Sequence, residues 1–368
     1  MKHAFRISLP LAGVCLALSA CGEGSTTTPN PGTVTPPPSA TPSPSPSPDQ
    51  FAEVKDAIDA FNDDNFAVLV GTGDGIVFSY EKGSFPLDQK VPIASASKWL
   101  TGATIYRLVE KGEMSLTDNP QDYLPFWTND PDDPRSQVTL ENLLSFTSGF
   151  NAFPESNDCV NDPATTLELC ASSIYEAGLD SAPGEAFSYG PEHMHVAAAM
   201  AERVTGKAFV DLFSDEIAQP LGMSQATRFT FPSALNPLPS GGARSNAEDY
   251  ALFLSALLQG NLINDLDEFH ASRTVTATIL YSPVDGTGAG DWGYALGSFV
   301  ECDEATFSQD CADDTINSSA GSFGWTPWID RKNGYWGLIA RRGETGSSAV
   351  AIRLEQSLQP LIIEALAD

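Results

Sequence analysis

The chain is 368 residues long, and its 48 Asp and Glu residues far outnumber its 19 Lys and Arg residues, which gives a formal net charge of −29 at pH 7. Such a surface repels other polyanions, so nucleic acid and anionic lipid surfaces are poor partners. We predict no nucleic-acid ligand and assign the acidic surface no catalytic role.

The chain opens with an export signal. Lys2 and Arg6 precede an apolar run, Ile7–Leu18, that is too short to span a bilayer as a permanent helix. Small residues then lead to Cys21 and Gly22, a pattern that resembles the bacterial lipobox, in which Cys21 would be acylated. The alternative is an ordinary signal peptide with an incidental cysteine.

We favour the lipoprotein, because residues 22–50 are largely Thr, Ser, Pro and Gly and cannot bury a core. Alternating Pro and Ser favours an extended spacer of about 3.1 Å per residue. The predicted organisation is a signal peptide over 1–20, a lipidated cysteine and tether over 21–50, and one globular domain over 51–368. The lipid would anchor that domain to a membrane of the cell envelope, the outer membrane if the host is Gram-negative.

Four further cysteines form two close pairs, Cys159 with Cys170 and Cys302 with Cys311. Export permits two local disulfides. Zinc is the alternative, but no C-x-x-C spacing or nearby histidine supports it. We therefore predict disulfides, and neither a metal nor another cofactor.

The sequence offers little support for a catalytic triad that contains histidine. The sequence has no G-x-S-x-G nucleophile elbow. Beyond the signal, His270 is isolated, and His193 and His195 are separated by one residue. On a helix these two rings would diverge, which disfavours a metal site.

A serine hydrolase without histidine can use lysine, and two S-x-x-K motifs occur. Ser79–Lys82 lies in a predicted hairpin turned at 72–75, where residues i and i+3 face opposite sides of a strand. Ser95–Lys98 instead enters a stretch of helical periodicity that ends at Gly112. We predict that only the second copy brings its serine and lysine together.

We expect Ser95 to lie at the N-terminus of this helix, and this position determines the chemistry of Ser95 and Lys98. There the backbone N–H of Ser95 is unpaired and the helix dipole favours developing negative charge, which provides half of an oxyanion hole. Burial of Lys98 would lower its pKa and let it accept the serine proton. A capped surface helix is the structural alternative.

These surroundings resemble the β-lactamase-related serine hydrolases, which include class C β-lactamases, D-alanyl-D-alanine carboxypeptidases and esterases. The first motif of that family is similar to residues 92–98, PIASASK. Its LL-x-H-T-S-G segment is similar to residues 138–149, with Phe146 in place of histidine. Its GG-x-x-S-T-x-x-D segment, which organises the fold, is similar to residues 240–250.

The other two catalytic motifs are matched less completely. The Y-x-N motif resembles Tyr189 to Pro191, which implies that Tyr189 ionises or relays protons; a packed aromatic residue is the alternative. The K-T-G or H-x-G motif resembles the segment that begins at Ser319. Gly321 would let substrate approach the backbone, and the N–H of Ser322 would be the second oxyanion donor. Pro191 replaces the asparagine, and Ser319 replaces the substrate-binding cation.

The resemblance implies an α+β, β-lactamase/transpeptidase-like fold, in which terminal helices flank an antiparallel sheet and a mainly helical domain is inserted from about Ser115 to Leu262. The sequence itself indicates a hairpin turned at 330–334 and an amphipathic C-terminal helix over 348–366.

The implied reaction is hydrolysis of a small-molecule ester or amide through an acyl-enzyme. We favour an esterase over a β-lactamase or D-alanyl-D-alanine carboxypeptidase, because the two replacements remove groups that bind the carboxylate and amide of those substrates. A compensating cation from Arg331, Arg341 or Arg342 would change that preference. A non-catalytic binding module on the same scaffold is the remaining alternative.

Overall fold

The structure, a computed structural model, describes residues 50–367 apart from 151–156, 288, 303–305 and 313–315. The predicted signal peptide, Cys21 and nearly all of the predicted tether lie outside these residues, so their organisation stays a prediction. Within the described part of the chain, no helix combines the length and apolar character needed to cross a membrane.

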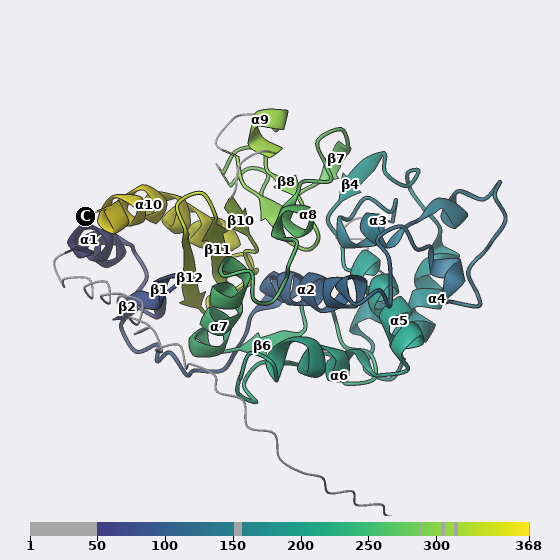
Figure 1. Cartoon of the computed structure of the whole chain (residues 1–368), viewed down its shortest axis with the longest axis horizontal. Coiled ribbons are helices and arrows are strands. Elements are labelled where there is room, and N and C mark those ends of the chain that lie inside the picture. The colour runs from purple at the N-terminus through teal and green to yellow at the C-terminus, as the bar shows by residue number, and fades with distance from the viewer. Residues whose placement is uncertain (1–49, 151–156, 288, 303–305, 313–315, 368) are drawn as a thin grey trace, which may run out of the picture. The chain divides into compact units, whose positions relative to one another are not determined.

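A seven-stranded antiparallel sheet is built from segments near both ends of the domain (Figure 1). Its strands are β1 (Phe66–Thr72), β2 (Gly75–Lys82), β8 (Gly293–Tyr294), β9 (Phe299–Val300), β10 (Ile316–Ser318), β11 (Thr326–Asp330) and β12 (Tyr335–Arg341). The strand order is β2-β1-β12-β11-β10-β9-β8. The first six residues of β1 are buried, as its continuous apolar run predicts for a strand covered on both faces.

Both predicted hairpins are present. Thr72 pairs with Gly75 at the first turn, and Asp330 pairs with Tyr335 at the second. Ser79 is exposed on β2, while the ammonium group of Lys82 donates to backbone carbonyls at the end of the N-terminal helix. The first S-x-x-K motif therefore has a structural role, as predicted from its place on a strand.

The terminal helices α1 (Ala52–Ala60) and α10 (Ser348–Ala367) lie side by side against one face of this sheet (Figure 1). Their buried residues recur every four positions, which places them on one helical stripe. Full burial of each Val, Leu or Ile contributes roughly 1.5–3 kcal/mol relative to exposure. The shared cluster comprises Val54, Ile58, Leu354, Leu358 and Ile362 from the helices and Val68, Val70, Trp328 and Ile339 from the sheet.

The described residues between 83 and 292 add no strand to the large sheet and are mainly helical. The helices are α2 (Ser97–Glu110), α3 (Leu140–Leu144), α4 (Leu167–Ala177), α5 (Glu192–Thr205), α6 (Phe209–Phe213), α7 (Ala247–Leu258) and α8 (Leu266–His270). A further short helix, α9 (Gln309–Ala312), lies between β9 and β10. The α+β fold with an inserted helical part is thus confirmed.

Two small sheets in this part were not predicted. One has the order β3-β6-β5 and the other pairs β4 with β7 in parallel. Strands of two to four residues are too short to show a clear alternation of apolar and polar positions. Their bounds are β3 (Val91–Pro92), β4 (Ala186–Ser188), β5 (Arg228–Phe229), β6 (Ala243–Ser245) and β7 (Thr278–Tyr281).

Helix α2 lies in the interior, with eleven of its fourteen residues buried. Its backbone is in close contact with the chain before β9, because a Cβ added to Gly102 would lie 2.1 Å from the carbonyl oxygen of Leu296. Any residue other than glycine there would push the helix away. This contact fixes the position of α2 relative to the large sheet.

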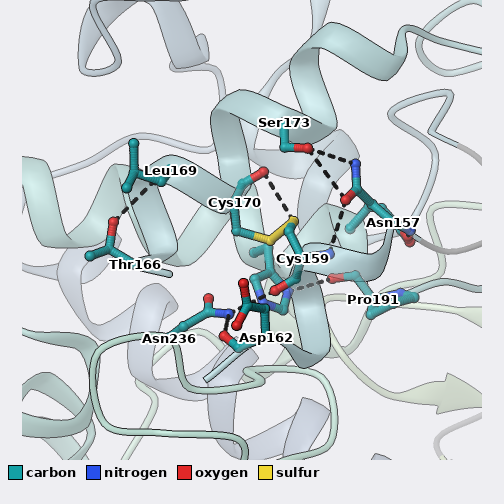
Figure 2. The surroundings of a disulfide bond; sticks show 11 residues. Asn157, Cys159, Asp162, Thr166, Leu169, Cys170, Ser173, Pro191 and Asn236 are labelled. Carbon is teal, nitrogen blue, oxygen red and sulfur yellow. Dashed lines mark hydrogen bonds between the residues drawn. A yellow bond between two sulfur atoms is a disulfide. The ribbon is translucent and has the colours of Figure 1, made fainter. Parts of the chain in front are cut away.

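Both predicted disulfides are present, Cys159–Cys170 and Cys302–Cys311. Figure 2 shows that the first joins the short 3-10 segment η4 (Asp158–Asn161) to α4. The side-chain amide of Asn236 donates to the carbonyls of Cys159 and Asp162, at 2.8 and 2.9 Å. Covalent and hydrogen-bonded links therefore hold η4 in place near the start of α5.

Candidate active site

Ser95 lies in a single 3-10 turn, η1 (Ala94–Ala96), between β3 and α2. Ala94 has a φ of 47°, in the left-handed region that alanine rarely adopts, and so the chain turns sharply before the helix. The Ser97 hydroxyl holds this turn by donating to the Ala94 carbonyl at 2.6 Å and accepting from the Ala243 N–H at 3.1 Å. The α-helix therefore begins two residues after Ser95 rather than at Ser95.

Lys98 lies beside the hydroxyl of Ser95. Its Nζ is 3.1 Å from Ser95 Oγ and donates to the carbonyl of Ser240 at 2.7 Å. The lysine is only 4% exposed, and this burial lowers its pKa to about 7, against the opposing effect of the Glu192 carboxylate. A lysine with this pKa can exchange a proton near neutral pH.

Tyr189 directly follows β4, and its ring centroid is 4.5 Å from Lys98 Nζ. The ring stacks on Phe299 at 5.7 Å and meets Phe146 edge-on at 5.4 Å. Burial raises the pKa of Tyr189, although a hydrogen bond with Ser95 acts in the opposite direction. The phenol therefore keeps its proton at neutral pH, which favours a proton relay over the ionised tyrosine that the sequence also allowed.

The segment between β10 and β11 lies directly against the nucleophile turn. Ser319 donates its hydroxyl proton to the carbonyl of Ser95 at 3.2 Å and is almost fully buried. A Cβ added to Gly321 would lie 2.1 Å from the carbonyl oxygen of Ile93, so only glycine permits this approach. Ser319 thus binds the backbone of the nucleophile turn and does not supply the cation that it replaces.

The N–H groups of Ser95 and Ser322 are available for an oxyanion. Among the described residues, neither donates to a backbone acceptor. The carbonyl of Ser322 accepts from the N–H groups of Gly346 and Ser347, both at 2.9 Å, which fixes the orientation of this segment. Two free backbone donors of this kind would stabilise a tetrahedral oxyanion that formed between them, so both remain candidates for the oxyanion hole.

Two groups at the site were not predicted as site groups. One is the backbone carbonyl of Ser240, from the segment expected only to organise the fold. The other is Glu192 at the start of α5, which is 3% exposed and whose Oε1 accepts the N–H of Asn157 at 2.7 Å. Its Oε2 has no hydrogen-bond partner among the described residues. Burial raises the pKa of Glu192, and the Lys98 charge acts against that rise.

His193 is also at the site but has a structural role. Its Nδ1 lies 2.7 Å from Ser148 Oγ and its Nε2 lies 2.9 Å from the carbonyl of Ser188. Its ring stacks on Phe146, which replaces the histidine of the family motif, at 4.9 Å. Burial lowers the pKa of His193 to about 3, so the ring stays neutral. In the described part of the chain, no three metal-ligating side chains form a cluster.

Only one of the three candidate arginines remains for the missing cation. Arg342 stacks over the ring of Phe323 at 3.8 Å, next to Ser322, and forms no ion pair with a described carboxylate. The other two are neutralised by ion pairs, Arg331 with Asp267 and Arg341 with Asp63.

The family model described as Beta-lactamase matches residues 54–352, which is most of the domain. This chain therefore belongs to the beta-lactamase family of serine hydrolases.

Individual relatives are more distant. Protein flp of Staphylococcus aureus (strain MW2) is 27% identical over 138 residues, which are 38% of this chain and 28% of that protein. A crystal structure from Bacteroides dorei DSM 17855, assigned to the beta-lactamases, is 25% identical with a TM-score of 0.70 and covers 84% of this chain and 97% of its own. EstCE1, described as a hydrolase with promiscuous acyltransferase activity, is 18% identical with a TM-score of 0.66, over 83% and 97% of the two chains.

These relatives support the fold more strongly than the reaction. The chain spans under a third of the length of Protein flp. The likeness to EstCE1 shows the fold alone. Family and fold are established, whereas the substrate class has to be inferred from the geometry of the site.

Proposed function

We propose that this protein hydrolyses esters through an acyl-enzyme on Ser95. The observation that carries this proposal is the 3.1 Å separation of Lys98 Nζ and Ser95 Oγ in a site where burial lowers the lysine pKa to about 7. About half of such a lysine is unprotonated at pH 7, and this form can act as the base. A capped surface helix would leave this lysine in water with an ordinary pKa.

The residues at the site can account for every proton transfer in this reaction. Ser95 Oγ attacks the ester carbonyl carbon as Lys98 accepts the hydroxyl proton. The carbonyl oxygen becomes an oxyanion, which the N–H groups of Ser95 and Ser322 stabilise. The C–O bond to the alcohol then breaks, and the alcohol takes a proton passed from Lys98 through Tyr189. Water attacks the acyl-enzyme, and its proton passes through Lys98 to restore the Ser95 hydroxyl as the acid leaves.

A neutral ester suits this site better than a β-lactam or a D-alanyl-D-alanine peptide. Both of the latter carry a carboxylate, which Ser319 cannot pair, and an amide, which Pro191 cannot contact. Losing a charge-assisted hydrogen bond costs about 1.5–3 kcal/mol, and about 1.4 kcal/mol is a tenfold factor. Selectivity for the anionic substrates should therefore be lower by roughly one to two orders of magnitude.

Hydrolysis of a β-lactam or peptide is the second candidate function, and the position of Arg342 favours it. This arginine adjoins the segment of Ser322 and has no carboxylate partner among the described residues. Its guanidinium would supply the cation that Ser319 lacks, if the side chain moves from Phe323 to the substrate.

The test compares kcat/KM at fixed salt for a short-chain p-nitrophenyl ester, an unactivated ester, a chromogenic cephalosporin and a D-alanyl-D-alanine peptide. We expect both esters to exceed the cephalosporin and the peptide. The Arg342→Gln variant should leave the ester values unchanged. Arg331→Gln, which removes the same charge from an ion-paired arginine, is the control.

If the wild type preferred the cephalosporin or the peptide over both esters, the assignment as an esterase would be wrong. If that preference were lost in Arg342→Gln and kept in Arg331→Gln, the second candidate would replace it. Hydrolysis of none of the four substrates, with a folded protein, would count against the acyl-enzyme itself.

A further inference from the structure

Three cationic side chains lie on the outer face of the small sheet β3-β6-β5. Arg228 of β5 is directly opposite Arg244 of β6, and Arg244 is opposite Pro92 of β3. Lys90 directly precedes β3, and its ammonium group is close enough to both arginines for their charges to lower its pKa. The other face of the sheet is buried, through Val91, Phe229, Ala243 and Ser245.

These three charges are close together and are not neutralised by acidic residues. Arg244 Nη2 donates to the backbone carbonyl of Lys90 at 3.3 Å. Burial lowers the pKa of Lys90, and the charges of Arg228 and Arg244 lower it further. Among the described residues, none of the three forms an ion pair with a carboxylate.

An unpaired cluster of positive charges is unusual for a chain with 48 acidic and only 19 basic residues. Ten other Lys and Arg side chains of the described domain do form ion pairs. Like charges directly opposite each other on neighbouring strands destabilise a sheet. A bound anion would remove that repulsion.

We propose that Lys90, Arg228 and Arg244 form a binding site for one small, multiply charged oxyanion of the phosphate or sulfate class. Neighbouring strands are about 4.8 Å apart, so side chains from all three can reach one tetrahedral anion. The planar guanidinium group binds such oxygens through two parallel hydrogen bonds.

The charge of the whole chain selects a small ligand over a large one. The formal net charge of −29 repels an anionic membrane or a long polyanion, much of which would face the acidic surface outside this site. A single small anion in contact with three cations lies within the Debye length of about 8 Å at physiological salt, where the local positive charge dominates.

The site shares its sheet with the nucleophile turn. The N–H of Ile93, between β3 and Ser95, donates to the carbonyl of Ala243 in β6 at 3.1 Å. An anion bridging the three strands should therefore also stabilise the sheet that leads to Ser95. We expect phosphate to raise the melting temperature more than chloride does at equal ionic strength.

The test is calorimetric titration of the full-length protein with inorganic phosphate and, separately, with sulfate, at an ionic strength held constant with chloride. We expect saturable binding of one anion per chain. The double variant Arg228→Gln/Arg244→Gln should bind at least tenfold more weakly. Arg203→Gln/Lys207→Gln, which removes the same charge from two exposed, ion-paired cations, should bind like the wild type.

Three results would overturn the proposal. One is the absence of saturable binding in the millimolar range. Another is equal binding by the wild type and the Arg228/Arg244 variant, which would indicate an adventitious ion only. The third is tighter binding to vesicles of anionic phospholipid than to free phosphate, which would assign the face to a membrane. Circular dichroism and ester hydrolysis, measured on the same samples, separate these results from misfolding and from failure of the proposed function.

Discussion

Lys98 and Glu192 oppose each other at the level of single residues. Burial lowers the pKa of the lysine and raises that of the glutamate, so each group is pushed toward its neutral form. The attraction between their charges acts the other way on both. The protonation of the base therefore depends on an acidic residue with no assigned role in the bond-breaking steps.

The pH dependence of ester hydrolysis should report this pair. Protonated Lys98 cannot accept a proton, so wild-type kcat/KM should rise with pH through about 7 and level off above it. Glu192→Gln removes a charge that raises the lysine pKa, and so the rise should move to lower pH. Well below the midpoint, each half unit of pKa changes the unprotonated fraction roughly threefold.

Glu202→Gln is the matched control for the pH–rate profile. Glu202 is on the same helix, also accepts one backbone N–H, from Phe209 at 2.8 Å, and also has a pKa raised by burial. Glu202 is not among the groups that shift the pKa of Lys98. The control profile should overlay that of the wild type. A midpoint that stays or rises in Glu192→Gln would refute the coupling.

At the level of elements, the approach of the β10–β11 segment to the nucleophile turn depends on Gly321. In Gly321→Ala the new Cβ overlaps a backbone carbonyl, which no side-chain rotation can relieve. We expect the segment to shift, kcat for an ester to fall at least tenfold, and the free energy of unfolding to fall by about 1–3 kcal/mol. Steady-state kinetics and urea denaturation measure the two effects.

Gly73→Ala is the control for this substitution. Gly73 lies in the β1–β2 turn, and an added Cβ there meets nothing within 4 Å. This variant should behave like the wild type. Equal effects in the two variants would mean that close approach at Gly321 does not position the proposed oxyanion donor, the N–H of Ser322.

The disulfide that joins η4 to α4 should contribute to the stability of the inserted part. On the loop-entropy account, closing its short loop stabilises the fold by about 3 kcal/mol. Cys159→Ala/Cys170→Ala should therefore lower the melting temperature by several degrees, as measured by thermal denaturation of the non-reduced protein. An unchanged melting temperature, or free thiols at these positions in the non-reduced wild type, would exclude this contribution.

Helical periodicity predicted the helix that carries Lys98, because such a pattern is encoded within a few adjacent residues. The 3-10 turn of Ser95 and the strand β4 before Tyr189 are too short to show a pattern, and these two residues were found through motifs instead. Contacts between distant segments were not predictable in this way. The Ser240 carbonyl lies 142 residues from Lys98, and only the completed fold brings them together. Glu192 was missed for the same reason, since no pattern around it indicates that α5 places it near α2.

At the level of the whole molecule, the predicted lipid anchor rests on the sequence before residue 51. Wild-type protein should fractionate with membranes and carry an acyl mass on Cys21. Cys21→Ala should release the protein or leave it unprocessed. Fractionation of the wild type as free protein, with no acyl mass on Cys21, would rule out the lipoprotein.

The most direct test of the central claim is the covalent labelling of Ser95. The purified domain is treated with a fluorophosphonate probe, and the adduct is located by mass spectrometry of its peptides. We predict a single adduct on Ser95 that is absent in Ser95→Ala and forms far more slowly in Lys98→Met. Unchanged labelling of Ser95→Ala, or no labelling of the wild type under conditions where a related esterase reacts, would contradict the assignment of Ser95 as the nucleophile.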